Sequence, residues 1–223
     1  MRELENLGVS NLKIYQDTEL YRFTSDSVLL AKFTRVKKGD VVADFCSGSG
    51  IVGFYLYGLN PDKIENLTFF EMQSSLCSMS VDSIALNGLQ DKFFAVNKKI
   101  QDIDNTFFNK FSLITVNPPY MNLEGGAVNQ REELAICKSE VYLPLSELCA
   151  KIGKCLKFGG RVNMVHRADR LCEVFGELKK NNIEPKRLQF VSAPNKKPYL
   201  FMVEGVKGGK VGLDVKENAI NKG

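Results

Sequence analysis

Short apolar runs alternate with amphipathic stretches along most of the chain. Residues Val41–Phe45 read VVADF, a β-branched run that is typical of a buried strand. Four later runs predict further strands, at Asn66–Glu71, Phe93–Asn97, Phe111–Asn117 and Arg161–His166. The stretches between them predict helices, at Ile51–Gly58, Ser74–Gly88, Val141–Gly160 and Ala168–Asn182. Strands that alternate with helices predict a parallel sheet that is covered on both faces.

The last two apolar runs, Lys186–Ala193 and Pro198–Gly208, are joined by a link that is too short for a crossover helix. We therefore expect these two strands to pair as an antiparallel hairpin. The whole chain is predicted to form one α/β domain, with a Rossmann-like, mostly parallel sheet of seven strands. The polar tail at 210–223 is expected to fray.

Composition excludes several kinds of site. The chain has six cysteines but no C-x-x-C pair, and His166 is its one histidine. We therefore expect no metal site and no disulfide scaffold. The opening residues lack the apolar core of a signal peptide, and no apolar run is long enough to cross a membrane. These patterns favour a cytoplasmic protein with reduced cysteines.

Charge is divided unevenly along the chain. Residues 1–150 hold 14 Lys and Arg against 19 Asp and Glu, a net charge of −5, whereas residues 151–223 hold 16 against 7, a net charge of +9. A basic final third is suited to contact with a polyanion such as RNA. Solvated lysines on an ordinary surface are the plainer interpretation of the same pattern.

A glycine-rich segment follows the first predicted parallel strand. It runs from Asp44 through Cys46, Gly48 and Gly50, at the strand end where open α/β sheets bind ligands. Glycines allow the backbone to pass close to a ligand, and a carboxylate at the strand end can accept hydrogen bonds from a cationic amino group. We therefore expect these four residues to bind a cofactor.

The next two strands also end beside acidic residues. Glu71 is placed to bind both hydroxyls of a ribose, and Met72 to pack on an adenine. Asp102, after the following strand, suits the amino group of the adenine ring. Together these residues predict an adenosine-type cofactor. The glycines alone, which also fit the dinucleotide pattern G-x-G-x-x-G at Gly48, Gly50 and Gly53, leave NAD open.

The tetrapeptide Asn117-Pro118-Pro119-Tyr120 ends the fourth predicted parallel strand and indicates the chemistry. An exocyclic amino nitrogen is a poor nucleophile because its lone pair is delocalised into the base. The side-chain oxygen of Asn117 and the carbonyl of Pro118 can hold its two N–H groups and direct the lone pair at a methyl donor. Pro119 restricts the residue before it, and Tyr120 offers a face on which an unpaired base can stack.

These motifs resemble those of class I S-adenosylmethionine-dependent methyltransferases with an N-P-P-[YF] motif. The resemblance covers nearly the whole chain and is closest to the bacterial family that N6-methylates the adenine 3′ of the anticodon in a valine tRNA. In Ile14–Phe33, residues Phe23 and Asp26 match this family, which implies that both lie over the cofactor pocket and that residues 1–40 form a lid-like segment. In the segment after Tyr120, Lys138 and Ser139 replace an Arg-His pair of the family.

The resemblance implies an enzyme that uses S-adenosylmethionine as its cofactor and an RNA, specifically a tRNA, as its partner, with no membrane partner. The residues expected to contact nucleic acid are Lys138, Lys186, Arg187, Lys196 and Lys197. Alternatives are guanine-N2 methylation of ribosomal RNA, glutamine-N5 methylation of a protein, and non-catalytic binding of cofactor or RNA. The first 40 residues are too few for the helical domain of glutamine methyltransferases, and no segment is long enough for the target-recognition insert of a DNA methyltransferase.

Overall fold

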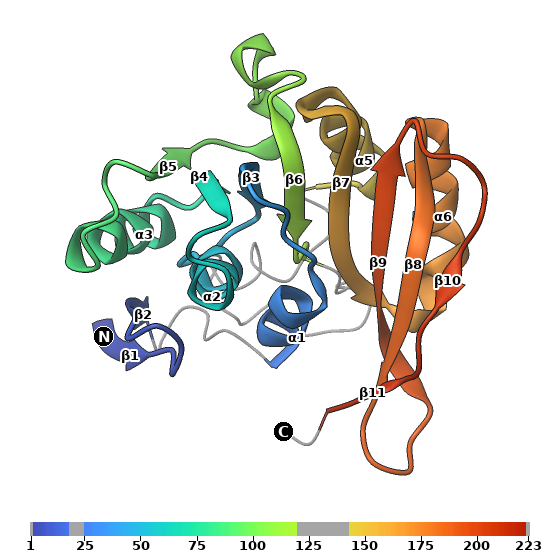
Figure 1. The fold of residues 1–223 in the computed structure, drawn as a ribbon, viewed down its shortest axis with the longest axis horizontal. Coiled ribbons are helices and arrows are strands. Elements are labelled where there is room, and N and C mark those ends of the chain that lie inside the picture. The colour runs from blue at the N-terminus through green and yellow to red at the C-terminus, as the bar shows by residue number, and fades with distance from the viewer. Residues whose placement is uncertain (1, 18–24, 120–142, 222–223) are drawn as a thin grey trace, which may run out of the picture.

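A computed structural model of the chain describes residues 2–17, 25–119 and 143–221. A mixed sheet has the strand order β10-β8-β9-β7-β6-β3-β4-β5, and β11 pairs with β8 (Figure 1). Its seven long strands are β3 (Asp40–Phe45), β4 (Ile64–Glu71), β5 (Phe93–Asn97), β6 (Phe111–Val116), β7 (Leu156–Arg167), β8 (Ile183–Ser192) and β9 (Pro198–Lys207). The strands β3 to β7 are parallel, and β9 is antiparallel to both β7 and β8. The predicted Rossmann-like sheet with a final antiparallel hairpin is confirmed.

Helices cover both faces of this sheet (Figure 1). On one face lie α1 (Ser25–Phe33) and α2 (Ile51–Leu59), and on the other lie α5 (Leu145–Cys155) and α6 (Leu171–Lys180). The remaining helix, α3 (Ser74–Leu86), follows β4 and contacts β2, β4 and β5. Short 3-10 turns are η1 (Ile100–Asp102), η2 (Asn105–Phe107) and η4 (Ala168–Arg170). No described helix is long and apolar enough to cross a membrane.

Aromatic side chains fill much of the core between these layers. Phe54 of α2 stacks on Phe69 of β4, with ring centroids 5.0 Å apart. On the opposite face Phe45 and Phe70 meet edge to face at 5.3 Å. The helix α2 can approach β4 this closely because position 53 is glycine, where a Cβ atom would lie 2.5 Å from the ring of Phe69. The third glycine of the loop pattern therefore serves helix–sheet packing.

Two local predictions need correction, and one further element was not predicted. The long helix predicted over 141–160 is shorter, because α5 ends at Cys155 and the chain continues directly into β7. The tail predicted to fray instead forms β10 (Asp214–Val215) and β11 (Ala219–Ile220), which both pair with β8. An N-terminal hairpin of β1 (Arg2–Asn6) and β2 (Lys13–Asp17) had no clear sequence signal, and it packs against α3.

One edge of the sheet collects the features expected of a site. Because β3, β4, β5, β6 and β7 are parallel, their carboxyl ends lie at the same edge. The strand β8 also runs in this direction, since it and β7 are both antiparallel to β9. The turn from β8 to β9, at residues 193–197, therefore extends from the carboxyl edge as well (Figure 1).

Candidate functional site

The loop between β3 and α2 is held in a shape that only particular residues favour. Cys46, Gly48 and Gly50 all have positive φ angles, of 56°, 57° and 88°. Glycine adopts this left-handed region readily, but Cys46 occupies it at a steric cost. The loop is closed by a hydrogen bond from the Gly50 amide to the Ser47 carbonyl at 2.8 Å. The predicted binding loop therefore has the tight backbone that brings amide groups close to a ligand.

Asp44 organises this loop from inside the protein. It is fully buried, and its carboxyl accepts hydrogen bonds from the Gly53 amide at 3.1 Å and the Thr115 hydroxyl at 2.7 Å. Burial raises the pKa of Asp44 to about 7, against the opposing effect of these two hydrogen bonds. Each carboxyl oxygen thus has a partner within the protein, which makes Asp44 a positioning residue for the loop.

Glu71 ends β4 directly beside the loop. Its carboxylate accepts hydrogen bonds from the amides of Gly48 and Gln73, each at 2.9 Å, and its burial raises the pKa of this carboxyl. Glu71 therefore connects two strand ends at the place where the sequence predicts ribose binding. Met72 follows it and is half-buried, and its carbonyl accepts a hydrogen bond from Asn97 at 3.0 Å.

Asp102 lies at the same edge of the sheet, because β4 and β5 are parallel and Glu71 stands opposite Asn97. It is exposed and ends the turn η1 that follows β5. The cofactor residues predicted from three separate strands are thus brought to one edge. Asp26, predicted from the resemblance, is half-buried in the first turn of α1. Phe23 lies outside the described residues.

Asn117, Pro118 and Pro119 follow β6, which is paired with β3. Phe45 stands opposite Val116 in that pairing, so Asn117 continues β6 at the level where the glycine loop begins. Asn117 is half-buried, and its side-chain amide donates a hydrogen bond to the Ser27 hydroxyl at 3.0 Å. The proposed amino-group acceptor therefore lies beside the predicted cofactor loop. Tyr120 and Lys138 lie outside the described residues.

Among the residues predicted to contact nucleic acid, Arg187 is corrected by the structure. It is buried, pairs with Glu204 at 3.1 Å and donates a hydrogen bond to the Phe33 carbonyl at 2.6 Å. The guanidinium of Arg187 therefore pairs within the protein and is not exposed for contact with RNA. Lys186 is half-buried and donates a hydrogen bond to the Lys210 carbonyl. Lys196 is exposed in the turn between β8 and β9, as is its neighbour Lys197.

Sequence reasoning missed three residues that hold the site together. Thr115 bonds Asp44, Ser27 bonds Asn117, and Gln16 of β2 donates a hydrogen bond to the Ser49 hydroxyl of the glycine loop at 2.6 Å. Gln16 and Ser27 lie within or beside the segment 14–33 that carries the family resemblance, which was the available signal. Thr115 carried the weaker signal of a polar residue inside an apolar strand.

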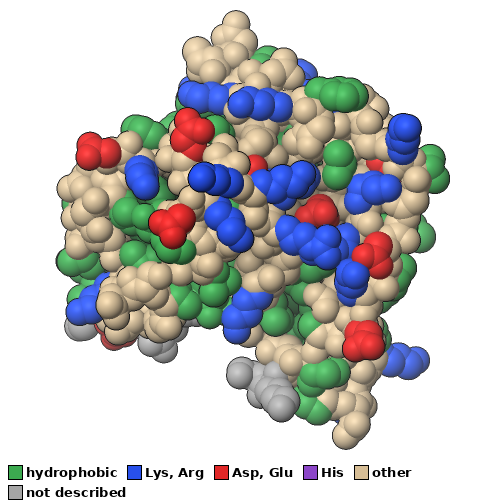
Figure 2. Space-filling model, viewed as in Figure 1, with side chains coloured by type: hydrophobic (Ala, Val, Ile, Leu, Met, Phe, Trp, Pro, Cys, Tyr) green, Lys and Arg blue, Asp and Glu red, His purple; other side chains and the backbone are tan. Residues whose placement is uncertain are grey.

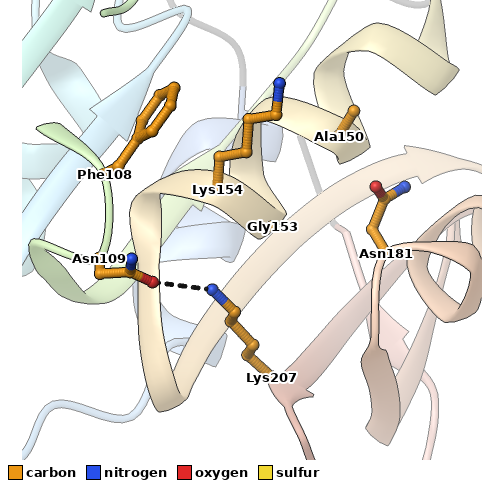
Figure 3. Close-up of a pocket in the computed structure, with 7 residues that line it drawn as sticks. All are labelled: Phe108, Asn109, Ala150, Gly153, Lys154, Asn181 and Lys207. Carbon is orange, nitrogen blue, oxygen red and sulfur yellow. Dashed lines mark hydrogen bonds between the residues drawn. The ribbon is translucent and has the colours of Figure 1, made fainter. Parts of the chain in front are cut away.

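An open cavity of about 310 Å³ lies away from this site (Figure 3). Its lining residues are Phe108, Asn109, Ala150, Gly153, Lys154, Asn181 and Lys207. Lys207 donates a hydrogen bond to the side-chain oxygen of Asn109 at 3.1 Å. Asn109 precedes β6 and Lys207 ends β9, so the cavity opens at the amino edge of the parallel strands. Strand-end chemistry identifies the site better than cavity size does.

Comparison with known proteins supplies the family. Residues 22–180 match the family model described as the methyltransferase small domain. The chain belongs to this family. It is accordingly an S-adenosylmethionine-dependent methyltransferase, which decides between this cofactor and the NAD that the glycine pattern alone left open.

Individual relatives agree with this assignment. The methyltransferase is 25% identical over 202 residues to a tRNA1(Val) (adenine(37)-N6)-methyltransferase of a Flavobacteriaceae bacterium (strain 3519-10), covering 82% of this chain and 81% of that protein. A predicted O-methyltransferase from Agrobacterium tumefaciens superposes with a TM-score of 0.68 at 14% identity, covering 87% and 86% of the two chains. TYW2 from P. horikoshii, solved in complex with MeSAdo, superposes with a TM-score of 0.62 at 16% identity, covering 93% and 72%. The two structures share the fold of this chain.

The described residues fit S-adenosylmethionine. The narrow glycine loop leaves its backbone open to a ligand, and Glu71 supplies a buried carboxylate at the end of the next strand. When bound, this cofactor supplies a methyl group that its sulfonium makes electrophilic. Asn117 ends the neighbouring strand β6 at the same edge of the sheet, and its role toward the methyl acceptor stays a prediction.

Proposed function

We propose that this methyltransferase N6-methylates an adenine in RNA, most specifically the adenine 3′ of the anticodon in a tRNA, in the cytoplasm. The observation that carries the proposal is the position of Asn117-Pro118-Pro119 at the end of β6, beside the glycine loop. Two oxygen acceptors at this point suit an exocyclic amino group, whose two N–H groups need partners. The activity for which the Flavobacteriaceae relative is named, adenine-N6 methylation of a tRNA, supports the same reaction.

Basic residues near the carboxyl edge support an RNA substrate. Lys196 and Lys197 are exposed in the β8–β9 turn, which extends from the edge that carries Asn117. Phosphates of an RNA whose target base reaches Asn117 would pass near this turn. By contrast, Lys179 and Lys180 end α6 just before β8 begins, so they lie at the opposite edge. The two lysine pairs therefore compare the two edges of the sheet, with the difference that Lys179 and Lys180 also pair with Glu184 and Glu177.

A second basic segment was hidden by the negative net charge of residues 1–150. Lys32, Arg35, Lys37 and Lys38 lie within seven residues that contain no acid, and all four are exposed. Among the described residues, none of the four forms a salt bridge. Lys and Arg side chains are spread over the middle of the face that Figure 2 presents. This charge adds to the electrostatic attraction that a polyanionic substrate would experience.

The proposal is tested by supplying the purified chain with methyl-labelled cofactor and, separately, tRNA, ribosomal RNA, DNA and a release-factor peptide. Nucleoside mass spectrometry should find N6-methyladenosine in the tRNA, and Asn117→Ala should lower turnover roughly 100-fold or more with little change in cofactor affinity. N2-methylguanosine in ribosomal RNA, or methylated glutamine in the peptide, would establish one of the alternatives. Binding of tRNA without methylation would support a non-catalytic role.

The docking surface is tested with two charge-reversed variants. Lys196→Glu combined with Lys197→Glu should weaken tRNA binding and reduce its dependence on salt, because phosphate contacts release counterions. Lys179→Glu combined with Lys180→Glu makes the same change of charge at the far edge and should have a smaller effect. Equal losses in the two variants would show that net charge, and not the β8–β9 turn, determines RNA affinity.

A further inference from the structure

The hydrogen bond from Asn117 to Ser27 joins residues that are 90 positions apart in the chain. Ser27 is the third residue of α1, and only 1% of it is exposed, whereas its neighbours Ser25 and Asp26 are half-buried. A serine early in a helix commonly faces solvent or bonds to its own helix. Ser27 instead turns toward the sheet, and the side chain that it meets is the predicted catalytic amide.

The chemistry of a carboxamide makes this contact important. Turning the amide of Asn117 by half a rotation exchanges its oxygen and nitrogen with little change in shape. An amino group with two N–H donors needs the oxygen, because the nitrogen would place donors against donors. In the structure the Ser27 hydroxyl accepts from the amide nitrogen at 3.0 Å, with the amide oxygen on the other side of the carboxamide. Because a hydroxyl can donate as well as accept, this bond fixes the place of the carboxamide, and a target amino group, which has only donors to offer, selects the oxygen.

We propose that Ser27 is a positioning residue that fixes the place of the Asn117 carboxamide, so that its oxygen can accept a hydrogen bond from the target amino group. This role rests on the proposed function of Asn117. Ser27 makes no contact with the reacting atoms in the proposal, and it acts through Asn117. Correct orientation of one group can change a rate by about 100-fold without a change in binding.

Ser27 can act in this way because α1 itself is fixed. Leu30 and Ala31 are fully buried beneath the helix. At its end, Arg187 donates a hydrogen bond to the Phe33 carbonyl and stacks over the Phe33 ring at 4.0 Å. A cation at this position also suits the negative end of the helix dipole.

A second buried arginine continues the same attachment. Arg161 donates hydrogen bonds to the Arg35 carbonyl at 2.5 Å and to Asp40 at 2.6 Å. The first bond joins the chain after α1 to β7, and the second joins β7 to the first residue of β3. The side chains of Arg161 and Asp40 are only 6% and 5% exposed. The helix that carries Ser27 is therefore fixed to the sheet by two arginines that are themselves in buried ion pairs, Arg161 with Asp40 and Arg187 with Glu204.

The test compares four single variants of the full chain, one of them Asn117→Ala, and one double variant. Ser27→Ala should lower single-turnover rate roughly 10- to 100-fold while the Kd for S-adenosylmethionine and the KM for RNA stay within about twofold. Ser27→Thr keeps the hydroxyl and should retain most of the rate. Thr34→Val is the matched control. Thr34 directly follows α1, and its hydroxyl donates a hydrogen bond to the Leu30 carbonyl of this helix at 2.8 Å, so the variant loses a hydroxyl near Ser27 that does not bond Asn117.

The double variant separates positioning from general damage. If Ser27 acts only through Asn117, then Ser27→Ala should have no further effect on rate in an Asn117→Ala background. A Ser27→Ala enzyme with more than half of the parental rate would overturn the proposal. So would a loss shared equally by Ser27→Thr, or one that appears only as weaker cofactor binding and a lower Tm.

Failure of the two proposals is distinguishable. A parent enzyme that methylates no RNA contradicts the proposed function, and the same five variants are then compared on whichever substrate the parent does methylate. An active parent whose rate survives both Asn117→Ala and Ser27→Ala contradicts the proposed role of the motif and of Ser27 together. An active parent that needs Asn117 but not Ser27 contradicts the positioning role alone.

Discussion

A row of buried polar residues crosses the sheet, and its two ends differ. One residue on each of five neighbouring strands lies directly opposite the next. In the order β3, β6, β7, β9 and β8 these residues are Asp44, Thr115, Asn163, Glu204 and Arg187, and each is no more than 8% exposed. At one end Asp44 accepts hydrogen bonds from an amide and a hydroxyl, both neutral groups. At the other end Glu204 pairs with a buried arginine at 3.1 Å.

The two ends of this row therefore have different roles, one in stability and one in the candidate site. The Arg187–Glu204 pair compensates its own charge and anchors α1, so it needs no ligand. Asp44 and the neighbouring Glu71 are carboxyls whose pKa values are raised by burial, and they lie at the carboxyl edge where cofactors bind. Buried acids without a cationic partner therefore identify the site better than the total number of buried charges does.

The largest effect is expected where charge is compensated. Arg187→Ala should lower the free energy of unfolding by about 3–5 kcal/mol, because Glu204 is left as an uncompensated buried charge. Chemical denaturation at neutral pH measures the loss. Arg187→Met combined with Glu204→Leu removes both charges and should recover much of the stability. An Arg187→Ala protein within about 1 kcal/mol of the parent would show that the pair is solvated.

At the other end of the row, pH is the probe. Folding raises the pKa of Asp44 from 3.8 to about 7, so between these values the folded protein keeps a proton that the unfolded chain has lost. The stabilising contribution is complete below about pH 4. It is lost as pH rises through 7, and amounts to about 2–4 kcal/mol.

The Asp44→Asn variant isolates this contribution, because asparagine resembles the protonated acid in shape. The difference in unfolding free energy between parent and variant should fall as pH rises from 4 to above 7. Groups that are present in both proteins, such as Asp169 and Asp214 with their lowered pKa values, cancel in that difference. A difference that is constant with pH would mean that Asp44 is ionised throughout.

The pattern of apolar runs predicted most of the sheet, because buried strands and helix starts have local signals. The strand β5 was predicted with its exact limits, and β3, β4, β6 and β9 to within two residues. The register of pairing is not a local property, so Asp214 and Ala219 were predicted to lie in a frayed tail although they pair with β8. Similarly, α5 ended early at Cys155 because the strand that follows it begins before its two glycines.

The site divides in the same way. Glu71 and Asn117 could be found because strand ends of a parallel sheet meet at one edge. The burial of Arg187 could not be predicted, because Lys186 and Arg187 are both basic and adjacent in the sequence. Their side chains lie on opposite faces of β8, and only that of Arg187 is buried. Ser27 was also hidden, since its partner lies 90 residues away.

Substitution of Glu71 should weaken cofactor binding more than removal of the Arg187–Glu204 pair does. Glu71→Ala removes a buried carboxylate from the predicted ribose position, and S-adenosylmethionine should bind more weakly by about 2 kcal/mol, or about 30-fold. Calorimetry measures the affinity, and Arg187→Met with Glu204→Leu is the control that should bind normally. Unchanged affinity in Glu71→Ala would mean that the ribose contacts lie elsewhere at the edge.

The smallest effect is expected where the row reaches the surface. Asp214 of β10 stands opposite Arg187, and it pairs with Lys216 at 2.7 Å while both side chains are at least 40% exposed. This pair lowers the pKa of Asp214, but water and salt screen exposed charges so well that such pairs add little stability. Lys216→Ala should therefore shift Tm by no more than about 2 °C. A shift as large as that of Arg187→Ala would mean that β10 closes over the row more tightly than an exposed edge strand does, and that proximity to Arg187, not burial, determines the importance of a charge.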